Sequence, residues 1–108
     1  MADQAGRVAV VTGGGRGLGR AIALGLAGAG ARVAIVSRGQ EQLQETVALG
    51  SAADGEIVAA PCDVSDAAAV ERMAGDVEAR LGRASILVNA AGTFGPIALI
   101  RDVDPIEW

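Results

Sequence analysis

The chain has 108 residues, enough for one small domain, and a hydrophobic fraction of 51% that can supply a core. Its net charge of −4 argues against a nucleic-acid partner, because no cluster of basic residues offsets repulsion from a phosphate backbone. The first residues lack the basic-then-apolar order of a signal peptide, and no apolar run approaches membrane-spanning length. We therefore expect a cytoplasmic protein that binds neither nucleic acid nor membrane.

The first strand and helix enclose the most informative segment. Val8–Val11 is an uninterrupted apolar run rich in valine, which predicts a buried strand. The glycine-rich turn TGGGRGLG follows at 12–19 and leads into a helix, whose inward face is expected to carry Leu18, Ile22 and Leu26. A strand, a tight turn and a helix gather backbone N–H groups and a positive helix terminus at one point, which suits a pyrophosphate. The alternative is a glycine-rich connection without a ligand.

The remaining pattern alternates strands and helices. Strands are expected at 32–37, 56–60 and 85–89, and helices at 40–49 and from Ser65 or Asp66 to Leu81. Alternation of this kind predicts an α/β fold with a parallel sheet in the order 3-2-1-4 and helices on both faces. The ligand crevice is expected beside the glycine-rich turn, where the strand order reverses.

The end of the sequence carries a helix-start pattern. Asp104-Pro105-Ile106-Glu107 combines a capping residue, proline at the first helical position and glutamate at the third. Because only Trp108 follows, we expect a truncated piece of a longer protein, with the sheet interrupted after its fourth strand. The alternative is a short frayed turn.

Three phosphate-loop templates compete for the glycine-rich turn. Arg20 and the alanine after it stand where a P-loop needs lysine and a hydroxyl, and Gly-x-Gly-x-x-Gly fails in every register. The pattern Thr-Gly-x-x-x-Gly-x-Gly does fit, through Thr12, Gly13, Gly17 and Gly19. At these residues the chain resembles the classical branch of the short-chain dehydrogenase/reductase family, which binds a nicotinamide cofactor on a Rossmann-type sheet.

Two later segments extend the resemblance. Asp63 and Val64 follow the third strand, and the family's Asp-Val pair at this place implies contact with the adenine amino group; a helix cap is a second role open to Asp63. The segment at 89–92, Asn-Ala-Ala-Gly, resembles the family's Asn-Asn-Ala-Gly motif, although Ala90 departs from the usual second asparagine. The resemblance implies that Asn89 ties neighbouring strands together and that the small residues admit the nicotinamide ribose.

The end of the second strand bears on the type of cofactor. NAD-binding proteins of this architecture place an acidic residue there, whereas this chain has Ser37 followed by Arg38. Arg16 lies in the glycine-rich turn, and two guanidinium groups with a hydroxyl suit a 2′-phosphate. In the family, basic residues at these two positions accompany NADP preference. We expect NADP(H) rather than NAD(H), the alternative for Arg38 being a solvated side chain.

The expected cofactor-binding residues are Thr12, Gly13, Gly15, Arg16, Gly17, Leu18, Gly19, Ser37, Arg38, Asp63, Val64, Asn89, Ala90, Ala91 and Gly92. No catalytic residue is assigned: the family uses Ser, Tyr-x-x-x-Lys and a further Asn, and this chain contains neither tyrosine nor lysine. With one cysteine, no histidine and no clustered carboxylates, no metal site is expected either. That cysteine, Cys62, is expected to be a small buried residue.

Residues 1–108 are thus interpreted as an NADP-binding Rossmann half-domain. The resemblance implies a full-length parent, a homo-oligomer, that transfers hydride between the cofactor and a carbonyl or secondary alcohol, similar to 3-oxoacyl-carrier-protein reductases. We expect the chain alone to be inactive. The alternatives are a non-catalytic NADP(H)-binding module and an inactive structural fragment.

Overall fold

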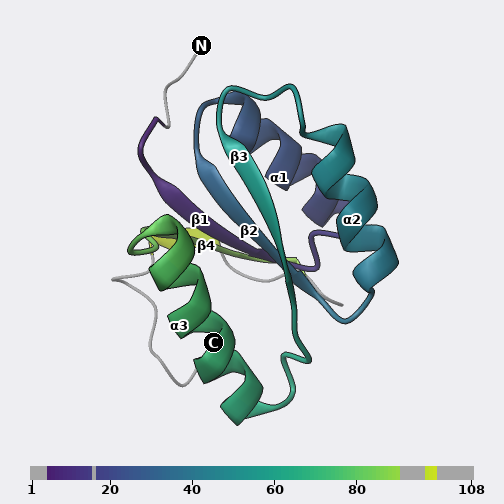
Figure 1. Ribbon diagram of the computed structural model, residues 1–108, viewed down its shortest axis with the longest axis vertical. Helices are drawn as coiled ribbons and strands as arrows, with labels where there is room; N and C mark the ends of the chain where they lie inside the picture. The colour runs from purple at the N-terminus through teal and green to yellow at the C-terminus, as the bar shows by residue number, and fades with distance from the viewer. Residues whose placement is uncertain (1–4, 16, 91–96, 100–108) are drawn as a thin grey trace.

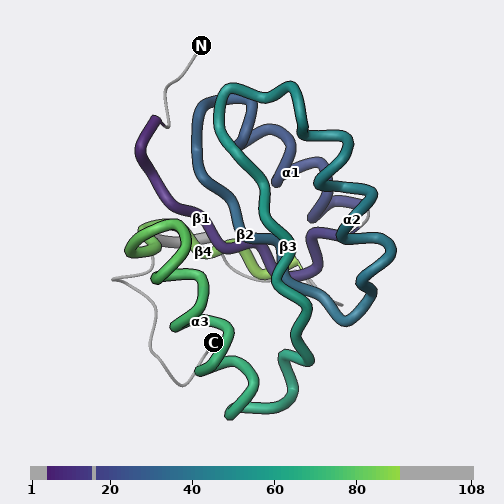
Figure 2. The backbone as a smooth tube through the Cα atoms, in the orientation of Figure 1, coloured from purple at the N-terminus to yellow at the C-terminus, as the bar shows by residue number. Residues whose placement is uncertain are grey.

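The computed structural model describes residues 5–15, 17–90 and the backbone of 97–99. Its elements are β1 (Val8–Thr12), α1 (Gly17–Gly28), β2 (Arg32–Ser37), α2 (Gln40–Leu49), β3 (Glu56–Pro61), α3 (Ala67–Leu81), β4 (Ile86–Asn89) and β5 (Ile97–Leu99). The chain can be followed through them in Figure 1, and as a plain trace in Figure 2. The elements expected at 104–107 lie outside the described residues.

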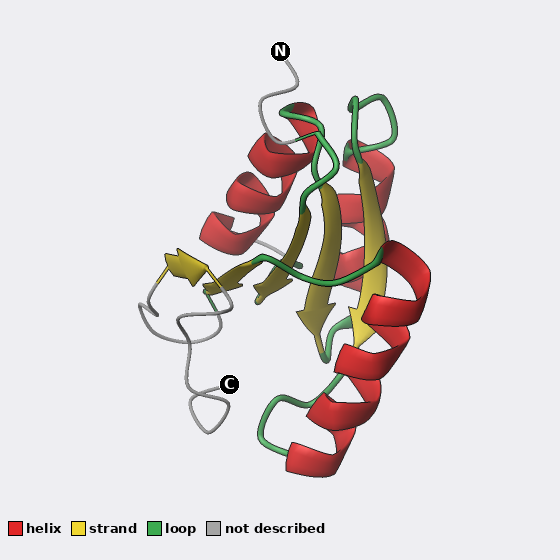
Figure 3. Ribbon diagram, turned by 90° about the vertical axis from the view of Figure 1, so that its left-hand side faces the viewer, coloured by secondary structure: helices red, strands yellow, loops and turns green. Residues whose placement is uncertain are grey.

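The sheet has the predicted order. Its strands run β3-β2-β1-β4-β5, and the first four are mutually parallel. Helices lie on both sides of this sheet (Figure 3). The α/β class, the order 3-2-1-4 and the two-sided cover are therefore confirmed.

One strand was not predicted from the sequence. β5 pairs antiparallel with β4, with Ile97 opposite Val88 and Leu99 opposite Ile86, so the sheet continues by one short strand beyond its fourth. Three apolar residues are too few for periodicity to distinguish a strand from other structure.

β1 is buried along its whole length because both faces of the sheet are covered. Ala9 and Val11 join the core beneath α1 and α2, whereas Val8 and Val10 join the core beneath α3. Successive side chains of a strand point to opposite faces, so a strand between two cores needs apolar residues at every position. This explains the continuous run of valine and alanine.

The predicted inward face of α1 is wrong. The buried residues are Gly19, Ala23 and Ala27, while Leu18 is 58% exposed. Ile22 and Leu26 are only half-buried at the side of the core. The helix approaches the sheet so closely that only small side chains fit between them, and the larger ones are displaced to the flanks.

The other two helices follow their predicted patterns more closely. Leu43 of α2 is fully buried and Met73, Val77 and Leu81 of α3 face the core. Asp66 caps α3, its carboxylate accepting hydrogen bonds from the backbone N–H groups of the second and third helical residues.

The other end of α3 is held by Arg32. This side chain donates to the carbonyl oxygen of Leu81 at 2.8 Å and pairs with Glu56 at 3.0 Å.

Among the helices described, none has the length and apolar character required to cross a membrane.

Replacing Asp66 with alanine removes the acceptor for the N–H groups of Ala68 and Ala69. We expect the free energy of unfolding, measured by urea denaturation, to fall by about 1 kcal/mol. Asp76→Ala, which removes an exposed carboxylate from the middle of the same helix, is the control and should change it by less than about 0.5 kcal/mol. Equal losses in the two variants would contradict the capping role.

Candidate functional site

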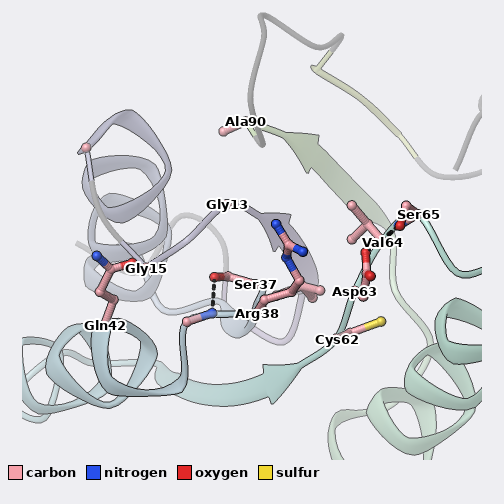
Figure 4. A pocket seen from close by; sticks show the side chains of 13 residues that line it. Gly13, Gly15, Ser37, Arg38, Gln42, Cys62, Asp63, Val64, Ser65 and Ala90 are labelled. Atoms are coloured by element: carbon pink, nitrogen blue, oxygen red, sulfur yellow. Dashed lines mark hydrogen bonds between the residues drawn. The ribbon is translucent and has the colours of Figure 1, made fainter.

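A cavity of about 670 Å³ opens where the carboxyl ends of β1, β2 and β3 meet the loops that follow them (Figure 4). The strand register brings these ends together, with Thr12 beside Val36 and Asn89, and Ser37 beside Pro61. The residues that border the cavity are Gly13, Gly15, Gly17, Val36, Ser37, Arg38, Gly39, Gln42, Cys62, Asp63, Val64, Ser65 and Ala90.

The glycine-rich turn forms one wall. The N–H of Gly13 donates to the carbonyl oxygen of Val36 at 2.7 Å, and the φ of Gly13 is 75°, which side chains other than glycine resist. A Cβ on Gly19 would collide with the carbonyl group of Gly13. Glycine is therefore required at 13 for the turn and at 19 for the close approach of α1.

Thr12 and Asn89 join β1 to β4 just behind the cavity. The Thr12 hydroxyl donates to Oδ1 of Asn89 at 2.8 Å, and the N–H of Ala90 donates to the carbonyl oxygen of Thr12 at 3.1 Å. Neither Thr12 nor Asn89 borders the cavity. Their contacts hold in place the neighbouring residues Gly13 and Ala90, which do border the cavity.

The outer side of the glycine-rich turn rests on α2. Thr46 is fully buried, and its hydroxyl oxygen lies 3.0 Å from the carbonyl oxygen of Gly14 and 3.3 Å from that of Gly15. Arg20 donates from Nε to this hydroxyl at 2.9 Å and from Nη2 to the carbonyl oxygen of Gly15 at 2.6 Å. Side chains from two different helices thus meet at the Gly15 carbonyl group, and Thr46 also contacts that of Gly14.

Ser37 and Arg38 lie at the end of β2. Ser37 Oγ accepts a hydrogen bond from the N–H of Gly39 at 3.0 Å, which keeps the serine side chain beside the cavity. Figure 4 shows the Arg38 side chain extending over the cavity, between the sides formed by Gly13 and Asp63. Within the described residues, its guanidinium makes no ion pair. The cavity thus carries a positive charge that an anionic ligand can meet.

Asp63 lies on the opposite side, after β3. Its Oδ1 accepts hydrogen bonds from the hydroxyl of Ser65 at 2.6 Å and from the Ser65 N–H at 3.0 Å. These bonds, the hydroxyl first, hold the pKa of Asp63 below its usual range, and the charge of Arg38 lowers it further. The alternative role of Asp63 as a helix cap belongs instead to Asp66. The Asp63 carboxylate is therefore ionised at neutral pH and available as an acceptor.

Cys62 precedes this carboxylate. It is buried, as expected, and burial raises the pKa of its thiol, with the nearby charges of Asp63 and Asp66 adding to the effect. The thiol is therefore protonated near neutral pH and behaves as a small apolar group.

The structure brings most of the expected residues together. Those that border the cavity are Gly13, Gly15, Gly17, Ser37, Arg38, Asp63, Val64 and Ala90. Those that do not border it are Thr12, Leu18, Gly19 and Asn89. Arg16, Ala91 and Gly92 lie outside the described residues.

Sequence reasoning missed several contributors. Gln42 borders the cavity, and Thr46 and Arg20 support its glycine-rich wall. The available signals were local anomalies: a threonine beside the inward positions of α2, and an arginine in the first turn of α1, where a positive charge opposes the helix dipole.

Comparison with known proteins gives consistent matches. The short chain dehydrogenase family profile matches residues 7–108. The rhamnolipids biosynthesis 3-oxoacyl-[acyl-carrier-protein] reductase of Pseudomonas aeruginosa is 48% identical over 98 residues, which is 88% of this chain and 37% of that protein. The chain spans 23% to 39% of the length of the curated relatives that it matches.

Solved structures agree with these relatives. The Pseudomonas aeruginosa RhlG/NADP active-site complex superposes with a TM-score of 0.76 and 46% identity, over 85% of this chain and 37% of that one. A metagenomic short-chain oxidoreductase in complex with NADP gives a TM-score of 0.77 and 41% identity, over 96% of this chain and 47% of that one.

Replacing Ser65 with alanine removes the hydroxyl that contributes most to the low pKa of Asp63. We expect that pKa to rise toward the usual aspartate value, as followed by NMR titration of the side-chain carboxyl carbon. Because the folded-state pKa lies below the unfolded one, this bond stabilises the fold above the unfolded pKa. The stabilisation is lost as the pH falls through the folded pKa.

Ser51→Ala, in the exposed turn after α2, is the control and should leave the titration of Asp63 unchanged. A pKa for Asp63 that is the same in Ser65→Ala and in the unmodified chain would show that the hydroxyl does not matter.

Proposed function

This chain belongs to the short chain dehydrogenase family, and from that membership we propose that residues 1–108 form the NADP(H)-binding part of an oxidoreductase. The observation that carries the proposal is the cavity at the carboxyl ends of the parallel strands, bordered by a glycine-rich turn on one side and by Arg38 on another. Ligands of open α/β sheets bind in such a crevice, where the strand order reverses.

The residues present fit a dinucleotide. At Gly13 and Gly19 a side chain would strain the turn or collide with it, so the backbone can come close to a pyrophosphate. α1 begins at Gly17, which borders the cavity, and the positive end of this helix favours an anion there. In this proposal the N–H groups of the turn bind the pyrophosphate.

The choice of NADP(H) over NAD(H) rests on the end of β2. An NAD site needs a carboxylate here to accept hydrogen bonds from the ribose 2′-hydroxyl, and Ser37 provides none. A 2′-phosphate would instead meet the Arg38 guanidinium and the Ser37 hydroxyl, with Arg16 of the turn as a second expected cation. The NADP in two of the matched solved structures supports the same choice.

Two other parts of the cavity suit the adenine and the nicotinamide ribose. Asp63 is an ionised acceptor at the rim, so we propose that it binds the adenine amino group, with Val64 against the ring. Ala90 leaves room beside β4 for the nicotinamide ribose, together with Ala91 and Gly92 of the sequence motif. Thr12, Leu18, Gly19 and Asn89 support this site without bordering the cavity.

The bound nicotinamide supplies hydride transfer, and this chain supplies the binding and orientation of the ring. The substrate of the whole protein is proposed to be a carbonyl or secondary alcohol, in line with the 3-oxoacyl reductase among its relatives. The cytoplasmic location and the homo-oligomeric parent stay predictions.

A second candidate is a non-catalytic NADP(H)-binding module. It is favoured by the composition of these 108 residues, which include no tyrosine, lysine or histidine to move a proton to or from a substrate oxygen.

The cofactor preference is tested by titrating the chain with NADPH and with NADH and following the fluorescence of the reduced nicotinamide. Arg38→Ala is expected to raise the Kd for NADPH on the order of 10- to 100-fold, the value of one or two charge-assisted hydrogen bonds, and to leave the Kd for NADH unchanged. Arg7→Ala, an exposed arginine that does not border the cavity, is the matched control. Equal NADPH binding by all three proteins would contradict the assignment of Arg38.

Turnover separates the two candidate functions. We expect the 108-residue chain to bind NADPH without oxidising it in the presence of a 3-oxoacyl thioester, since loss of a general acid alone costs about 10²–10⁴-fold in rate. The measurement is absorbance of NADPH, with Arg38→Ala purified in parallel to reveal contaminating host enzymes. Turnover that disappears with Arg38→Ala would overturn the expectation and establish a catalytic chain.

A further inference from the structure

Two side chains beneath the glycine-rich turn, Thr46 and Arg20, contact the turn without lining the cavity. Thr46 contacts the carbonyl groups of Gly14 and Gly15, and Arg20 contacts that of Gly15, the residue of this pair that borders the cavity. We propose that Thr46 and Arg20 are positioning residues, which keep the turn in the conformation that binds the cofactor pyrophosphate. This inference rests on the function proposed above.

The turn needs such an anchor because of its composition. Glycine populates both signs of φ with similar ease, so the peptide unit between Gly14 and Gly15 meets little steric resistance to rotation. The C=O and N–H of a trans peptide point in opposite directions. Holding the Gly14 carbonyl against Thr46 therefore leaves the N–H of Gly15 facing away from α2. A flipped peptide would exchange a hydrogen-bond donor for an oxygen that repels a phosphate.

The hydroxyl of Thr46 suits this task. Its oxygen accepts from Nε of Arg20, so its single proton remains free to be donated to a neighbouring carbonyl oxygen. Three carbonyl oxygens lie within reach, those of Gly14, Gly15 and Gln42, at 3.0, 3.3 and 3.2 Å. Because Thr46 is fully buried, water cannot replace it as a donor.

Arg20 is placed against local preference. A cation in the first turn of a helix opposes the helix dipole, and α1 has no acidic residue there to compensate. Glu45 of α2 lies 3.5 Å from Arg20 and balances part of the charge. Residues that break a local rule are expected where function requires them. In exchange for the unfavourable position, Arg20 makes a hydrogen bond of 2.6 Å to the Gly15 carbonyl oxygen.

The test compares two ligands on the full chain. NADPH carries the pyrophosphate, whereas adenosine 2′-monophosphate carries only the phosphate expected to meet Arg38. Thr46→Val keeps the shape of the side chain and removes the hydroxyl. We expect it to raise the Kd for NADPH about tenfold, the value of roughly one buried hydrogen bond, and to leave the Kd for adenosine 2′-monophosphate unchanged. Thr46→Ser, which keeps the hydroxyl, should bind NADPH like the unmodified chain.

Arg20→Gln is the second variant, and it decides the question if Thr46→Val does not fold, because the Arg20 side chain is 22% exposed and tolerates replacement better. It should show the same selective loss. Arg32→Gln is its matched control: Arg32 also donates to a backbone carbonyl, that of Leu81, but away from the cavity. It should lower the melting temperature without changing either Kd.

The outcomes separate this inference from the function it rests on. Failure of the unmodified chain to bind NADPH overturns both. Normal NADPH binding by folded Thr46→Val and Arg20→Gln overturns the positioning role alone. An equal loss for both ligands also overturns it, because general destabilisation would then account for the effect.

Discussion

The contact between the first turn of α1 and the end of β1 sets the geometry of the site. Gly19 lies against the carbonyl group of Gly13 with no room for a Cβ, and Ala23 and Ala27 continue the close approach over the next two turns. A helix held at this distance keeps its positive end beside the cavity that Gly13 and Gly17 border. A larger residue at any of these positions would move the helix away from the sheet and separate its dipole from the turn.

The sheet is buried on both faces, and this fixes the strand β1 against which α1 packs. The parallel strands end along one edge, and the segments that follow them border the cavity. Partly buried polar contacts hold those segments in place: Thr12 with Asn89 between β1 and β4, and Thr46 with Arg20 beneath the turn. Each of these groups has a partner, so each adds order without the cost of an unsatisfied polar atom.

The charges of the cavity matter more than the charge of the chain. The net charge is −4, yet the glycine-rich turn and Arg38 make one part of the cavity attractive to anions. Asp63 gives another part an acceptor, and its low pKa keeps it ionised. Under the proposed function these two regions correspond to the phosphates and the adenine of one ligand. Short-range hydrogen bonds, rather than a long-range field, would then select it.

Local patterns were sufficient for the order of the elements, the two-sided sheet and the buried stripe of α3, because each depends on the spacing of apolar residues within one segment. The glycine-rich turn was recognisable for the same reason. The inward face of α1, the short strand β5 and the pairing of Arg20 with Thr46 were not, since they arise from contacts between distant segments. Arg20 and Thr46 are 26 residues apart, and only the packing of α2 against the turn brings them together.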